Sequence, residues 1–284
     1  MFARSLRILC NHSFIVGYII SACIYINILS PPLEAREQGR LPMELFSSAR
    51  YDAEDQNWAI LQSDNGLLYV GNSDGLLEYD GTSWRLLKLP TMGAVRSLAV
   101  DSKGTIFIGS QEDLGYLNYS PNGELQYISL YDKIPEENRG FNDVWRTVAT
   151  DKGVFFRSTS RLFRWYNGEL SVWIFKNRLR NIFHINGELY LQIQSKGFCK
   201  FINDSWQPIA GIEELHNKGV SAVYPVSDSE WLVLFRHNGI MRLVQGANGR
   251  WEKKEAGYPV NETLKQKQIY SSAQLADGSF VIGT

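Results

Sequence analysis

Six side chains suited to holding a ligand recur along the sequence at a regular interval. Each is the second residue of a short segment that leads into a turn. The interval between successive members ranges from the mid-thirties to the high forties in residues. They are Trp58, Arg96, Trp145, Arg180, Ser221 and Tyr270. Aromatic rings stack on the faces of sugars, and a guanidinium pairs with a carboxylate through two parallel hydrogen bonds. If the six meet in space, they form an aromatic and cationic ring suited to an acidic oligosaccharide.

A plainer interpretation of the same residues is that the arginines pair with acids of neighbouring repeats and the tryptophans pack. Motifs for other chemistry are missing from the sequence: there is no G-x-S-x-G, no H-E-x-x-H, no cysteine pair at zinc spacing and no phosphate-binding glycine loop. We therefore expect no catalytic residue, no metal ligand and no cofactor among these residues. A polysaccharide-cleaving enzyme remains an alternative, and it would need convergent carboxylates, or histidine with arginine, at the mouth of a channel.

The regular interval comes from an internal repeat that begins after residue 50. In the first unit, residues 57–60 lead through Asp64-Asn65-Gly66 into 67–71, and two further segments follow at 75–79 and from Trp84. Glycine or asparagine beside aspartate supplies the positive φ angles of tight turns, while β-branched and aromatic residues flank them. The later units start at residues 95, 144, 179, 220 and 269. Five units are complete, and the sixth stops after its second segment.

Repeats of about 40–50 residues with four strands each are typical of β-propeller blades. We predict an all-β fold, a β-propeller of four-stranded antiparallel blades with about five and a half blades present. If the first strand of each blade is innermost, the six recurring side chains lie near one end of the central channel. Tyr69, Phe107, Trp165 and Trp231 are expected to pack between neighbouring sheets. An open ring exposes strand edges and so favours pairing with a second copy as a homodimer.

The composition is that of a folded globular protein without a strongly charged face. The chain has 44% hydrophobic residues and a net charge of −1, with a mean hydropathy of −0.22. Direct nucleic-acid binding would need a basic face, so we expect none. Of three cysteines, Cys10 and Cys23 lie near the N-terminus and Cys199 has no evident partner. The sequence therefore predicts no disulfide framework.

The N-terminus has the three parts of a secretory signal. Arg4 and Arg7 precede an apolar run over 14–29, and the sequence turns polar from Glu34. No A-x-A cleavage site follows, and Cys23 lies in a segment similar to a lipoprotein box. A cleaved signal peptide, an uncleaved membrane anchor and a lipoprotein all remain open, and all imply export. We assign residues 1–36 to this leader and 37–284 to the propeller.

The first blade carries a specific resemblance. Its most telling stretches are 56–60, 66–72, 75–81 and Trp84-Arg85, and the likeness continues at 95–98, 114–117 and 141–145. Residues from about 41 to 284 resemble the periplasmic input region of Bacteroidetes-type two-component regulator propeller proteins. The resemblance implies a periplasmic sensor held at the inner membrane, by the leader or by a later span. It also implies a histidine kinase or a LuxR-type regulator as the output, beyond this chain.

These observations predict an extracytoplasmic ligand-sensing region that binds a small molecule or an oligosaccharide. Two alternatives stay open, a polysaccharide-active propeller enzyme (lyase or hydrolase) and a protein-interaction scaffold. Acidic residues converging on the channel would favour the enzyme.

Overall fold

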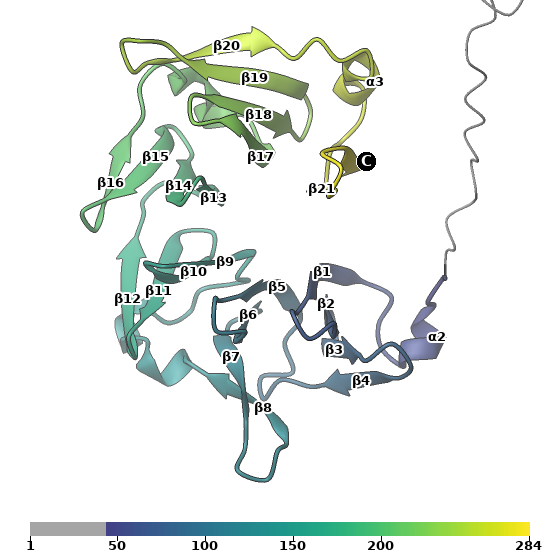
Figure 1. Ribbon diagram of the computed structural model, residues 1–284. Helices are drawn as coiled ribbons and strands as arrows, with labels where there is room; N and C mark the ends of the chain where they lie inside the picture. Colours follow the sequence, from purple (N-terminus) through teal and green to yellow (C-terminus); the bar gives the residue numbers. More distant parts are fainter. Residues whose placement is uncertain (1–43) are drawn as a thin grey trace, which may run out of the picture. The chain divides into compact units, whose positions relative to one another are not determined.

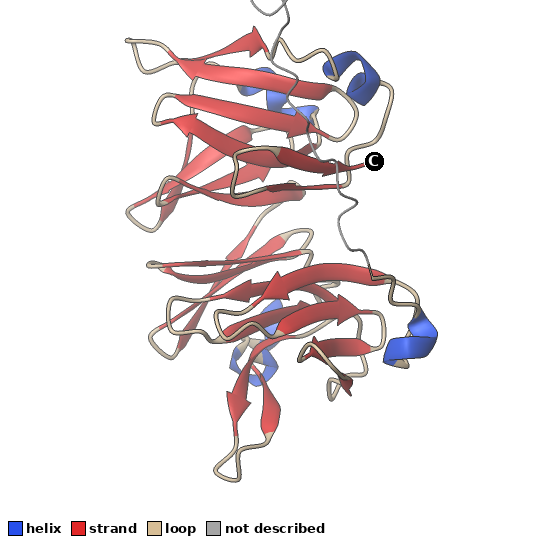
Figure 2. Ribbon diagram, turned by 45° about the vertical axis from the view of Figure 1, so that its right-hand side comes forward, coloured by secondary structure: helices blue, strands red, loops and turns tan. Residues whose placement is uncertain are grey.

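A computed structural model describes residues 44–284, and the predicted leader over 1–36 lies outside the described residues. Residues 46–284 form one compact unit. This unit is built almost entirely from antiparallel strands that follow one another along the chain (Figures 1 and 2). Within residues 44–284, no helix is long and apolar enough to cross a bilayer.

The strands form five four-stranded sheets and one two-stranded sheet. The first two sheets consist of β1 (Asn57–Gln62), β2 (Leu68–Asn72), β3 (Gly75–Tyr79), β4 (Trp84–Leu87), then β5 (Val95–Val100), β6 (Ile106–Ser110), β7 (Leu114–Tyr119) and β8 (Leu125–Ser129). The third consists of β9 (Arg146–Thr150), β10 (Gly153–Arg157), β11 (Arg161–Tyr166) and β12 (Glu169–Ile174). The fourth consists of β13 (Leu179–Ile185), β14 (Glu188–Ile193), β15 (Gly197–Ile202) and β16 (Ser205–Pro208). The fifth consists of β17 (Val220–Ser227), β18 (Glu230–Phe235), β19 (Gly239–Gln245) and β20 (Trp251–Glu255), and the last of β21 (Ser271–Gln274) and β22 (Phe280–Gly283).

Short helices occupy some of the connections. They are α2 (Ser48–Tyr51) before the first sheet, η1 (Tyr131–Lys133) and η2 (Glu136–Asn138) after the second, η3 (Glu213–Asn217) after the fourth and α3 (Asn261–Lys265) after the fifth.

The prediction of an all-β propeller with five and a half blades is confirmed. Within each sheet the strands are hydrogen-bonded in chain order, from the first strand to the last. The first strands of successive sheets contact one another, β1 with β5, β5 with β9, β9 with β13, and β13 with β17. The first strand of each blade is therefore the innermost, and the ring of described blades is not closed (Figure 1).

Apolar side chains from neighbouring blades pack together to form the core. One cluster joins the fourth and fifth blades and includes Tyr190, Trp231 and Trp251, and similar clusters join the other neighbours. Tyr69, Phe107 and Trp231 are buried as predicted. Trp165 is only partly buried, although it packs against the cluster of the second and third blades. Large flat side chains fill the gap because radial stacking covers both faces of each sheet.

Candidate ligand-binding site

Four of the six predicted ring residues are β-bulge positions at the start of an inner strand. The pairing with the second strand skips one residue at Trp58, Arg96, Arg180 and Ser221. The extra residue of a bulge is left out of the ladder, and the local twist re-aims its side chain. At these four positions the side chain therefore departs from the alternation between the two faces of the sheet.

The prediction that all six are the second residue of an inner strand is wrong for Trp145 and Tyr270. Both lie directly before their strands, because pairing with the second strand begins one residue later, as at Arg146 opposite Arg157. Their backbone amides still donate to that second strand, from Trp145 to the Arg157 carbonyl at 3.0 Å and from Tyr270 to the Gly283 carbonyl at 2.9 Å. Both residues therefore stay fixed at the entrance of the inner strand.

Trp58, Arg96 and Trp145 form one cluster, which we call the tryptophan platform. The two indole centroids are 6.0 Å apart in an edge-to-face arrangement. The Arg96 guanidinium carbon lies 3.9 Å from the Trp58 centroid and 5.2 Å from that of Trp145. Arg96 Nε also pairs with Asp143 Oδ1 at 2.7 Å. The plainer interpretation thus holds for Arg96, but Trp58 and Trp145 remain 40% and 37% exposed and can still receive a ligand.

Trp145 also lines a cavity of about 520 Å³ together with Arg180, Ser221 and Tyr270. We call it the channel cavity. Ser221 Oγ donates to the Ile269 carbonyl at 2.8 Å, and Tyr270 is 62% exposed. Trp58 and Arg96 are outside the lining but contact Trp145. The structure therefore brings the six predicted residues into one continuous region, as two adjoining groups joined by Trp145.

Four arginines of the channel cavity were not predicted from the repeat. Arg146, Arg157, Arg178 and Arg236 line it beside Arg180. The sequence signal that could have found them is local, since Arg146 follows Trp145 and Arg178 lies two residues before Arg180. Arg157 ends β10 and Arg236 follows β18, so both lie at the end of the second strand of a blade.

The lining of the channel cavity contains no aspartate, glutamate or histidine. Within residues 44–284, none of its five arginines makes an ion pair with a carboxylate. The cavity therefore carries an uncompensated positive charge.

Arg157 shows how strongly this environment acts on a guanidinium. It is only 7% exposed, and burial together with repulsion from Arg146 and Arg178 lowers its pKa to about 9. Its NH1 donates to the Leu179 carbonyl at 3.1 Å, while its Nε is buried without a partner. Arg146 also lines the cavity, and although the residue is exposed, desolvation by the surrounding protein atoms lowers its pKa as well. Both side chains stay protonated at neutral pH.

This arrangement can bind an anion, and it lacks the pair of carboxylates that glycoside hydrolysis requires. An entering anion would offset the repulsion among the arginines and would accept charge-assisted hydrogen bonds from the guanidinium groups that line the cavity. Glycoside hydrolysis needs two carboxylates around the scissile bond, and the cavity lining has none. Within the described part of the chain, no cluster of three or more His, Cys, Asp or Glu residues could hold a metal ion.

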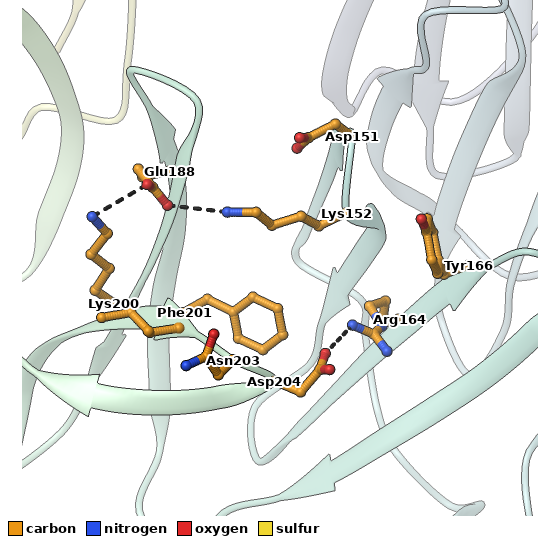
Figure 3. A pocket seen from close by; sticks show the side chains of 10 residues that line it. Asp151, Lys152, Arg164, Tyr166, Glu188, Lys200, Phe201, Asn203 and Asp204 are labelled. Carbon is orange, nitrogen blue, oxygen red and sulfur yellow. Dashed lines mark hydrogen bonds and ion pairs between the residues drawn. The ribbon is translucent and has the colours of Figure 1, made fainter.

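A second pocket, between the third and fourth blades, has a different charge pattern (Figure 3). Glu188 lies between two lysines, 3.1 Å from Lys152 and 3.4 Å from Lys200, and Arg164 pairs with Asp204 at 2.5 Å. Opposite charges are thus matched within the pocket, and two of the pairs cross from one blade to the next. We interpret these pairs as links between blades, without the excess charge of the channel cavity.

The Glu188→Gln variant is expected to make stability less dependent on acidic pH. Partial burial alone would raise the pKa of Glu188, but hydrogen bonds and charges of Lys152 and Lys200 outweigh it, and the pKa is lowered. A carboxyl whose pKa is lower in the folded state stabilises the fold above its ordinary pKa and loses that effect as the pH falls. Urea unfolding at pH 7 should show a loss below about 1 kcal/mol. The loss should shrink as the pH falls below the ordinary pKa of a glutamate, and a loss independent of pH would contradict the role of the pair.

Comparison with known proteins identifies the fold by structure only. No family model matches the chain, and no curated protein matches it by sequence. Virginiamycin B lyase from Staphylococcus aureus superposes with a TM-score of 0.57 at 12% identity, over 80% of this chain and 76% of that one. The WD40 β-propeller domain of Doa1 gives 0.54 at 17% identity, over 80% and 78%. The extracellular domain of hybrid two-component system BT4673 from B. thetaiotaomicron gives 0.48 at 12% identity, over 80% of this chain and 36% of that chain. At such identities the similarity to the first two structures establishes the propeller fold and nothing further.

Proposed function

We propose that residues 37–284 are the extracytoplasmic ligand-sensing region of a two-component-type signalling protein, and that the ligand is an acidic oligosaccharide bound at the channel. The observation that carries the ligand proposal is the unpaired arginine cavity directly beside the exposed tryptophan platform. The resemblance of the first blade to periplasmic propeller sensors supports the sensing role, a periplasmic location and attachment to the inner membrane. The sensing role, the periplasmic location and the attachment to the inner membrane are proposals, and the propeller fold is compatible with each of them.

In this proposal the tryptophan platform binds a sugar ring and the channel cavity binds its acidic group. A sugar ring stacks on the exposed face of Trp145, where C–H groups meet the indole ring. The carboxylate of the same or the next sugar turns toward Arg180, which lines the channel cavity and makes no ion pair within the described residues. Asp143 holds Arg96 against both indoles and so keeps the platform in place before the ligand arrives.

An enzymatic function is the second candidate, and the cavity lining is the observation that bears on it. Convergent carboxylates would have favoured a polysaccharide-cleaving enzyme, and the channel cavity has neither a carboxylate nor a histidine in its lining. Binding without cleavage is therefore the function that this site favours.

Removing the platform should weaken ligand binding without unfolding the protein. We expect Trp145→Ala to lower the affinity for an acidic oligosaccharide by about tenfold or more, because a sugar–aromatic stack and its buried area are lost. Isothermal titration with a panel of acidic and neutral oligosaccharides measures this. Tyr166→Ala is the matched control, since Tyr166 is 43% exposed but lines the charge-matched pocket of Figure 3. A loss of affinity in Tyr166→Ala with none in Trp145→Ala would move the site to that pocket.

A further inference from the structure

The channel cavity collects five guanidinium groups from three consecutive blades. Arg146 and Arg157 come from the third blade, Arg178 and Arg180 from the fourth, and Arg236 from the fifth. The arginines approach closely enough that Arg146 and Arg178 act on the charge of Arg157. Like charges at such range repel, and holding them together lowers the stability of the empty site. Residues that serve only the fold would not need this arrangement.

Two of these arginines have buried donors that are not used. The Nε atoms of Arg157 and Arg180 have no hydrogen-bond partner within the described residues, and Arg157 is itself more than nine-tenths buried. A buried donor without a partner costs free energy and so adds to the cost of holding these arginines together. The five guanidinium groups and the absence of a carboxylate from the lining favour a ligand with negatively charged oxygen atoms.

We infer that the channel cavity binds a ligand with at least two negative charges, either two acidic groups on neighbouring sugars or one phosphate monoester. This inference rests on the proposed function for the position of the ligand, and it adds the number of charges. One guanidinium fork satisfies the two oxygens of a carboxylate. A single carboxylate therefore leaves the other arginines uncompensated. The cavity volume of about 520 Å³ is within the range of sites that hold an entire small ligand.

The test compares probes that differ in charge. The purified chain is titrated with glucose, glucuronate, glucose 6-phosphate and digalacturonate at constant ionic strength. We expect digalacturonate or glucose 6-phosphate, or both, to bind at least about tenfold more tightly than glucuronate, and which of the two does so identifies the source of the charge. The affinity for the doubly charged probe that binds more tightly should also fall more steeply with added salt than the affinity for glucuronate does.

Variants connect the charge effect to the cavity. Arg178→Ala removes an exposed side chain that makes no ion pair within the described residues, so the fold should persist. It should lower the affinity for the doubly charged probes by about tenfold and have a smaller effect on glucuronate. Arg250→Ala, which removes a 57% exposed arginine that is not part of the cavity lining, should change neither.

The outcomes separate the inference from the proposed function. Equal affinity for glucuronate and the doubly charged probes would overturn the inference and leave the channel as a site for acidic sugars. The inference would also be overturned if Arg250→Ala removed the preference for doubly charged probes and Arg178→Ala did not. The preference would then arise outside the channel cavity. Binding of no acidic probe, with Trp145→Ala also without effect on any oligosaccharide, would overturn both proposals.

Discussion

The Arg96→Ala/Arg180→Ala double variant is expected to bind an acidic oligosaccharide at least about 100-fold more weakly than the parent protein. Each charge-assisted hydrogen bond contributes roughly 1.5–3 kcal/mol, and about 1.4 kcal/mol corresponds to a factor of ten. Arg180 is the partner we propose for the ligand carboxylate, and Arg96 holds Trp58 and Trp145 in place. Both contributions disappear together in the double variant.

The controls separate lost contacts from a disturbed fold. Removing Arg96 leaves the carboxylate of Asp143 without its partner, so Asp143→Asn should be made alone and combined with Arg96→Ala. Arg85→Ala removes an arginine that pairs with Glu78 outside the channel and controls for the change in net charge. Titration calorimetry gives the affinity, and thermal unfolding confirms that the variants fold. Unchanged binding in the folded double variant would show that the six residues of the predicted ring do not form the ligand site.

The Trp231→Ala variant is expected to lose about 3–5 kcal/mol of unfolding free energy. Trp231 is 2% exposed, and its ring centroid lies 4.8 Å from Tyr190 and 4.0 Å from Trp251. It thus joins the fourth blade to the fifth, and alanine would leave a large cavity between them. Relaxation of the surrounding sheets is limited because each strand is fixed by its ladder. Urea unfolding followed by circular dichroism gives the change.

Trp145→Ala serves as the matched control for stability. The same side chain is removed, but Trp145 is 37% exposed and lies at the channel, so we expect a loss well below that of Trp231→Ala. Equal losses in the two variants would show that the interblade cluster does not carry the stability that we assign to it.

The blade pattern could be predicted from the sequence because turns and strands each have local causes. An Asn-Gly pair favours a tight hairpin turn, and in Asn167-Gly168 and Asn186-Gly187 all four residues have positive φ, from 49° to 84°. The predicted segment that starts at Trp84 also agrees with the structure, where β4 begins at that residue. The turns and strands expected from the sequence agree with the structure because each hairpin is fixed mainly by its own turn and cross-strand pairs.

The channel could be predicted only in part, because it is a property of several blades at once. Aligning the repeats samples one position per blade, and that position coincides with the bulges that face the channel at Trp58 and Arg180. The cavity also draws on residues before and after the inner strands, such as Arg178 and Arg236, which no single repeat position unites. Their convergence depends on how neighbouring sheets are stacked, which the pattern of one strand does not determine.

The most direct test of the central claim is a crystal structure of the chain bound to an acidic trisaccharide such as trigalacturonate. We predict that one sugar ring lies on Trp145 and that a carboxylate contacts Arg180 within the channel cavity. A trisaccharide bound in the charge-matched pocket beside Glu188 and Arg164, with the channel cavity unoccupied, would contradict the account.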